Sequence, residues 1–97
     1  MKKQEVFDYI DETAVRCNTL NYEHCGAKKR IADLKIGESA MLVFEHDKVD
    51  VCGSVHYCGD PKKFDVKELV KVTKENRGVY SMEITPADQI QTGKTYR

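Results

Sequence analysis

The feature that most constrains this chain is an alternation of apolar and polar residues that recurs between residues 41 and 85. Apolar or small side chains take every second position over 49–58, and the alternation returns over 79–85. Because successive side chains of a strand point to opposite faces, this pattern predicts strands with one buried face. Turn-forming tripeptides lie at 46–48 (His-Asp-Lys) and 59–61 (Gly-Asp-Pro). We therefore expect a small antiparallel sheet whose strands are joined by tight turns.

Residues 39–45 (Ser-Ala-Met-Leu-Val-Phe-Glu) form a short apolar run of strand length. We interpret this run as an uncovered strand at the edge of the sheet. An edge strand presents unpaired main-chain groups to another chain. This interpretation allows a homodimer that forms by pairing of two such edges.

Residues 65–76 fit two structures. Their apolar positions nearly alternate, with a break at Glu68 and Leu69, and Gly78 suits the left-handed position of a hairpin loop that follows. The same stretch can instead be a second helix, with Asp65 as N-cap and Glu68 three residues later. The β-branched residues favour the strand.

The N-terminal segment has the spacing of an amphipathic helix. Val6, Ile10, Ala14 and Cys17 fall on one helical face, and Asn18 can end the helix because asparagine tolerates the left-handed conformation. The predicted fold class is α+β, with this helix packed on a sheet of three or four strands. We expect one domain over residues 1–85 and a polar C-terminal tail over 86–97.

Composition places the chain among soluble globular proteins, since 40% of residues are hydrophobic and 33% are charged. No apolar run approaches the ~18 residues of a membrane-spanning helix. Acidic residues near the N-terminus do not fit a signal peptide. We therefore expect a cytoplasmic protein without a membrane partner, in which Cys17, Cys25, Cys52 and Cys58 are free thiols.

A zinc-stabilised module is one alternative. The soft ligands His24, Cys25, His56 and Cys58 form the most plausible metal site, because His56 and Cys58 share one strand face. Neither region has the Cys-x-x-Cys spacing of common zinc sites. The sequence therefore favours free thiols over zinc ligands.

The sequence predicts neither an enzyme nor a cofactor. Histidines and cysteines are present, but no acyl-transfer signature surrounds any cysteine. The run Gly93-Lys94-Thr95 matches the end of a phosphate-binding loop. Asp88, however, occupies the position at which that loop requires glycine.

A basic segment over residues 62–77 supports a second alternative, a small nucleic-acid-binding domain. A formal net charge of zero argues against a strongly electrostatic nucleic-acid binder. The candidate side chains are Lys62, Lys63, Lys67, Lys71, Lys74 and Arg77.

The leading hypothesis is a non-catalytic module that binds a larger protein. It follows from a single small domain with no catalytic set and no strong net charge. The candidate contacts are the acidic helix face and the polar sheet face, namely Glu5, Asp8, Glu12, Ser54 and His56. The layout of one helix and a small sheet is similar to that of small phage and mobile-element proteins, including inhibitors of bacterial defence nucleases.

Overall fold

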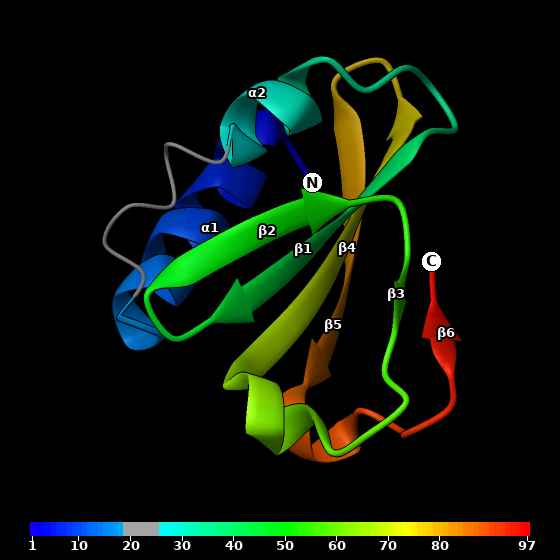
Figure 1. Cartoon of the computed structure of the whole chain (residues 1–97). Helices are drawn as coiled ribbons and strands as arrows, with labels where there is room; N and C mark the ends of the chain where they lie inside the picture. The colour runs from blue at the N-terminus through cyan, green and yellow to red at the C-terminus, as the bar shows by residue number, and fades with distance from the viewer. Residues whose placement is uncertain (19–25) are drawn as a thin grey trace.

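Two helices cover one face of a four-stranded antiparallel sheet, and a two-stranded sheet lies against the other face (Figure 1). The computed structural model describes residues 1–18 and 26–97. In the large sheet the strand order is β2-β1-β4-β5. This arrangement confirms the predicted α+β fold. The helices and large-sheet strands are α1 (Lys3–Arg16), α2 (Ala27–Ala32), β1 (Ser39–Glu45), β2 (Lys48–Cys52), β4 (Val66–Asn76) and β5 (Val79–Pro86).

Helix α1 forms as its apolar spacing predicts. Val6, Ile10 and Ala14 are buried against the sheet. The helix ends where Asn18 takes a positive φ of 55°. No helix among the described residues is long and apolar enough to cross a membrane.

Strand β1 lies between β2 and β4, so the prediction that residues 39–45 form an uncovered edge is wrong. Its alternate side chains enter two different clusters. Leu42 and Phe44 pack with the helices, whereas Met41 and Val43 pack with the layer on the opposite side. A continuous apolar run is typical of a strand buried on both faces.

Residues 66–76 form strand β4, and the alternative of a second helix capped by Asp65 is wrong. Asp65 has a φ of 54° and ends a 3-10 helix, η2 (Pro61–Phe64). Phe44 faces Glu68 while Glu45 faces Val66, so one extra residue of β4 forms a β-bulge there. This bulge explains the break in the alternation. Gly78 takes a φ of 70° in the loop between β4 and β5, as predicted.

The prediction of one strand over residues 49–58 is wrong in its continuity. Strand β2 ends at Cys52, and the chain bends at Gly53. It then forms β3 (Val55–His56), which pairs with β6 (Thr95–Tyr96).

The segment 86–97, predicted as a polar tail, contains structured elements. A 3-10 helix, η3 (Ala87–Gln89), leads to Ile90, which is buried in the cluster opposite the helices. Strand β6 then pairs with β3. The chain beyond Thr85 therefore packs with the rest of the domain.

Candidate protein-interaction edge

The outer side of β5 is the feature of this fold best suited to recognition. β5 is the last strand of the large sheet, and Met1 approaches its free side at Tyr80. The Met1 nitrogen donates to the Tyr80 carbonyl at 2.8 Å, and the Tyr80 N–H donates to the Met1 carbonyl at 2.8 Å. A reciprocal pair of this kind is the hydrogen-bonded pair of an antiparallel ladder. Tyr80 therefore directs both of its main-chain groups away from β4.

Alternation along the strand gives the orientation of the next residues. Tyr80, Met82, Ile84 and Pro86 share one phase, so the main-chain groups of Met82 and Ile84 also point outward. Pro86 fits this phase, because proline has no N–H and is tolerated where its nitrogen faces away from the ladder. Within residues 1–18 and 26–97, no main-chain hydrogen bond reaches Met82 or Ile84 from this outer side. Two residues thus offer four unpaired main-chain groups to an incoming strand.

On the helix side, this edge has an apolar surface. Met82 is half-buried against the core beneath the helices, and Ile84 keeps 41% of its surface exposed. An added strand would cover the exposed part of these side chains.

Helix α1 borders the edge with a row of polar side chains. Lys28 of α2 forms an ion pair with Asp11 at 2.9 Å and lies over the ring of Phe7, so this flank of α1 faces α2. Helix α2 packs on β2 and β1, whereas α1 packs on β5. The opposite flank of α1 therefore faces the free edge of β5. It carries residues spaced at i, i+4, i+7 and i+11, namely Glu5, Tyr9, Glu12 and Arg16.

A buried carboxylate fixes this row to the sheet. Glu68 of β4 is buried, and it accepts a hydrogen bond from the Tyr9 hydroxyl and one from Arg16 at 3.4 Å. Arg16 also donates to Thr13 Oγ1 at 2.9 Å. Burial raises the pKa of the Tyr9 hydroxyl, and the hydrogen bond to Glu68 raises it further. Arg16 neutralises Glu68, and the Glu5 carboxylate accepts a hydrogen bond from the Lys2 N–H, so the charges near this edge are Glu5, Glu12 and the Met1 ammonium group bonded to Tyr80.

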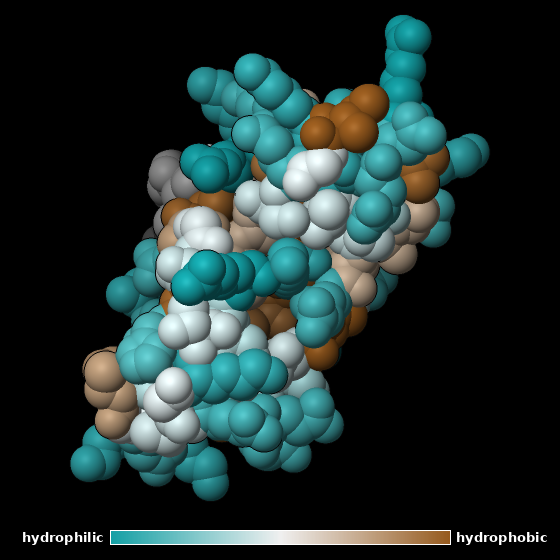
Figure 2. Space-filling view, turned by 90° about the vertical axis from the view of Figure 1, so that its right-hand side faces the viewer, coloured by the Kyte–Doolittle hydropathy of each residue, from teal (hydrophilic) through white to brown (hydrophobic). Residues whose placement is uncertain are grey.

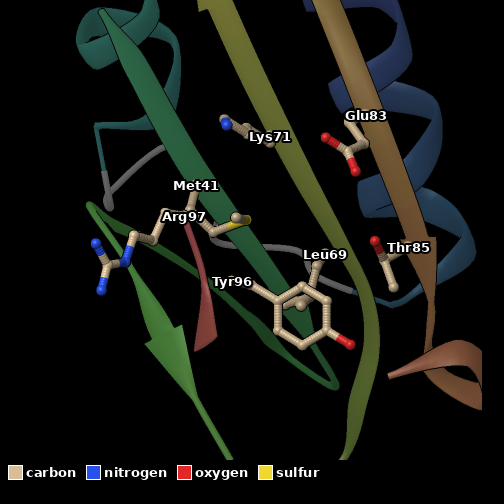
Figure 3. A pocket seen from close by; sticks show the side chains of 7 residues that line it. All are labelled: Met41, Leu69, Lys71, Glu83, Thr85, Tyr96 and Arg97. Atoms are coloured by element: carbon tan, nitrogen blue, oxygen red, sulfur yellow. The ribbon is translucent and has the colours of Figure 1, made fainter. Parts of the chain in front are cut away.

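The other flank of β5 borders a small cavity of about 30 Å³ (Figure 3). Lys71 and Glu83 face each other across β4 and β5, and the ring of Tyr96 from β6 lies beside Leu69. A cavity this small holds a few water molecules at most, whereas ligand pockets typically enclose about 300–1,000 Å³. This flank is therefore a polar wall beside the edge and not a small-molecule pocket.

Two wider hollows of about 290 and 380 Å³ share Arg30 and Asp33, near the end of α2. Their lining is mainly charged and polar, with Val51 as the apolar member of one and Leu34 of the other. The side of the molecule that carries β6 is also largely polar, with apolar atoms at the surface only in separate patches (Figure 2). The first hollow borders Val51 of the edge strand β2, and this side chain is half-buried, whereas Ile84 of β5 is exposed.

The predicted protein-binding residues lie on two sides of the molecule. Glu5, Asp8 and Glu12 are exposed on α1, whereas Ser54 and His56 are exposed in the layer across the sheet. The structure therefore does not bring these five residues together.

The predicted nucleic-acid-binding residues are also dispersed. Lys62 and Lys63 lie on η2 at one end of β4, and Arg77 lies in the loop at the other end. Eleven residues of strand separate these ends by about 36 Å at about 3.3 Å per residue. Lys67, Lys71 and Lys74 lie between them, and Lys71 faces Glu83 of the neighbouring strand. The basic segment is therefore a line along the molecule and not one patch.

The predicted metal ligands are only partly described. His24 and Cys25 lie outside the described residues. His56 bonds through Nδ1 to Thr95 Oγ1 at 2.8 Å, and Cys58 is an exposed free thiol. Among residues 1–18 and 26–97, no three His, Cys, Asp or Glu side chains gather as a metal site would require.

Sequence reasoning missed the β5 edge as a site. The alternation correctly placed Tyr80, Met82 and Ile84 on one face of a strand. The signal that was available is Pro86 at the end of this strand, since proline within a strand indicates an edge.

Comparisons of the chain with protein-family models, with curated proteins and with solved structures gave no match.

Proposed function

We propose that this protein is a non-catalytic binding module that pairs the outer side of β5 with an extended segment of a larger protein. The observation that carries the proposal is the pair of outward-facing residues Met82 and Ile84, beside an exposed apolar surface. In strand addition, main-chain hydrogen bonds supply affinity, and alternate side-chain contacts supply specificity.

The neighbouring contact of Met1 supports this mode of binding. Met1 forms an antiparallel pair with Tyr80 at one end of the free stretch. A partner strand that continues from this pair needs no rearrangement of β5, so little ordering of the module opposes binding.

The finer hypothesis is that the chain is a phage or mobile-element inhibitor that binds a host defence nuclease in the cytoplasm. It rests on the similarity of layout alone. Its test is a nuclease assay with the captured partner, in which addition of the module lowers the rate of cleavage. An unchanged rate at saturating module would contradict inhibition without contradicting binding.

The binding proposal itself is tested with Ile84→Pro, which removes an outward N–H but leaves the hydrogen bonds to β4 in place. Ile84→Ala is the matched control, since it removes the apolar side chain and keeps the N–H. We expect a partner captured from the native host to be lost with Ile84→Pro and only weakened with Ile84→Ala.

The captured partner is then purified and mixed with the module, and amide hydrogen exchange is measured. We expect slower exchange at Met82 and Ile84 in the complex, because strand addition protects these two amides. Equal capture by both variants, or unchanged exchange at both amides, would overturn the proposal. So would a small-molecule turnover with no protein partner.

A further inference from the structure

The helix-side face of the large sheet contains apolar rows that run across the strands and end at β5. In one row, Ile84 lies opposite Val70 of β4, which lies opposite Leu42 of β1. Val70 and Leu42 are fully buried, whereas Ile84 is 41% exposed. In the neighbouring row, Met82 lies opposite the buried Val72 and is itself only half-buried. In both rows, the side chain at the edge is therefore covered less than its neighbours.

Tyr80 shows the burial of a β5 side chain at a position that already has an outer neighbour. It lies on the same face as Met82 and Ile84, and Met1 pairs with its outer main-chain groups. Only 4% of Tyr80 is exposed. An added strand would give Met82 and Ile84 the outer neighbour that they lack, and burial of their remaining apolar surface would favour binding.

The opposite face of the same strand is polar. Glu83 lies opposite Lys71 of β4, and both side chains line the small cavity (Figure 3). Successive side chains of a strand point to opposite faces. In an added strand, the residue between the two that extend the apolar rows would therefore lie beside Glu83, where a polar side chain stays hydrated.

Charge does not select the partner at this edge, because both signs lie near it among the described residues. The charged groups are the Met1 ammonium, Lys2, Lys3 and Arg16, together with Glu5, Glu12 and Glu68. Apolar cover is the property that the edge lacks.

The free stretch limits how much of a partner can pair. Met1 occupies the position opposite Tyr80, and Pro86 has no N–H to donate. An incoming strand therefore pairs along residues 82–84 and has to end or turn before Met1. This length corresponds to a triplet of residues.

A second copy of β5 offers such a triplet in Met82-Glu83-Ile84, but two copies do not fit each other. Antiparallel pairing about Glu83 would bring Pro86 of the second copy to the position opposite Tyr80, which Met1 occupies. It would also place the two Glu83 carboxylates opposite each other, and like charges in that position destabilise a strand pair. A segment of another protein is therefore the better occupant.

Resting on the proposed function, we infer that the partner segment is a short extended triplet with an apolar, a polar and a second apolar residue. The two apolar side chains extend the rows that end at Met82 and Ile84, and the polar side chain lies beside Glu83. Apolar and β-branched side chains directly opposite each other stabilise strand pairs. Because the two apolar residues are separated by one residue, their spacing equals that of Met82 and Ile84.

The test uses three capped peptides that differ in the number and spacing of valines. The alternating peptide is Ser-Thr-Val-Thr-Val-Thr-Ser, the adjacent peptide is Ser-Thr-Val-Val-Thr-Thr-Ser, and the threonine peptide has threonine at all five inner positions. Valine and threonine are both β-branched and favour strands, so the peptides differ mainly in polarity. Binding is followed by the amide shifts of Met82 and Ile84 in the ¹⁵N-labelled protein, with peptide at millimolar concentration.

We expect the alternating peptide to bind about fivefold more tightly than the threonine peptide, as two apolar cross-strand pairs allow. The adjacent peptide is expected to be intermediate, because only one of its valines can face the helix side. Added sodium chloride is expected to leave the preference in place, since salt screens charges and not apolar contacts.

Protein variants assign the preference to one face of β5. In Ile84→Thr, one apolar row ends in a hydroxyl, and the preference is expected to fall from about fivefold to about twofold. Val79→Thr is the matched control, because Val79 is 45% exposed on the same strand but points to the opposite face. This control is expected to keep the fivefold preference.

Each other outcome overturns a defined part of the inference. If the three peptides bind the parent protein equally, the apolar pattern is wrong and strand addition stands. A preference that is unchanged in Ile84→Thr or lost in Val79→Thr would show that the wrong face was assigned. If no peptide shifts Met82 and Ile84, or if Ile84→Pro binds the alternating peptide unchanged, the use of the β5 edge is also wrong. A concentration-dependent dimer, shown by sedimentation and abolished by Ile84→Pro, would replace the segment of another protein by a second copy.

Discussion

The two edge strands of the large sheet, β2 and β5, meet the problem of unpaired main-chain groups in different ways. β2 has five residues, follows a tight turn, and carries ion pairs from Lys48 to Glu45 and Asp50 at 3.3 and 3.7 Å. Val49 on its helix-side face is fully buried. β5 has eight residues, and Ile84 on the same face of the sheet is exposed.

This difference indicates which edge strand is protected against pairing with another strand. Short length, charged side chains and cover by another element are the usual means of blocking an edge strand. β2 combines short length with charged side chains, and α2 packs on its helix-side face. β5 is blocked only at its ends, by Met1 and Pro86, so its middle stays open among the described residues. This difference favours β5 over β2 as the edge that takes part in the proposed recognition.

The largest expected effect is a difference in stability between proline at an inward-facing and at an outward-facing position of β5. Glu83→Pro removes an N–H that points toward β4, and we expect it to lower the free energy of unfolding by about 3 kcal/mol. Ile84→Pro removes an outward N–H and is expected to cost about 1 kcal/mol, mainly from the restricted φ. Urea unfolding followed by circular dichroism measures both values. Equal losses in the two variants would show that the phase assigned to β5 is wrong.

A smaller effect is expected when one apolar side chain of each edge strand is shortened and the losses in unfolding free energy are compared. Val49→Ala in β2 removes two buried methyl groups from a fully buried position and is expected to cost about 2 kcal/mol. Ile84→Ala in β5 is expected to cost about 0.5 kcal/mol, because this side chain is already exposed to water. If the order were reversed, Ile84 would be a structural residue, and the contrast between the edges would be lost.

The smallest expected effect is a loss of stability at high pH through Tyr57, which lies in the layer that follows β2 in the chain. Burial raises the pKa of Tyr57 from 10.0 to about 12, and the charges of Glu45, Cys52 and Asp50 add to the rise. Because the folded state favours the neutral phenol, its contribution to stability is complete below pH 10 and is lost as the pH rises toward about 12. One pH unit above 10, we expect a loss of about 1 kcal/mol in the free energy of unfolding.

Tyr57→Phe is the control for this last measurement, since phenylalanine does not ionise. The pH dependence of urea unfolding in the parent chain minus that in Tyr57→Phe isolates the phenol from the lysines that titrate in the same range. Identical pH dependence in both chains would show that Tyr57 is more hydrated than its burial indicates.

Local patterns were sufficient to predict helix α1, strand β5 and the α+β class, and they favoured a strand over a helix for residues 65–76. In each case a neighbouring signal fixes the structure, such as Asn18 after the helix or Gly78 in the hairpin loop. The strand order was not predictable in this way, because pairing joins residues that are distant in sequence. Residues 39–45 were accordingly placed at an edge, although their unbroken apolar run fits the central position of β1.

The site required the same non-local information. The alternation identified the face of β5 that holds Met82 and Ile84, but burial by α1 and pairing with β4 decide how much of that face stays open. The division of 49–58 into β2 and β3 also depends on β6, which lies about forty residues later. The position of the α1 row beside β5 also follows only from the packing of the helix on this strand.

The bracketing of the free stretch by Met1 and Pro86 has a consequence for self-assembly. A strand added to an edge creates a new edge, which is how cross-β structures grow, and the segments that form them are typically six or seven residues long. Among the described residues, Met82 and Ile84 have both main-chain groups free on this outer side, between a paired residue and a proline that lacks the N–H. We expect this length to be enough for recognition of a short segment and too short to seed a fibril.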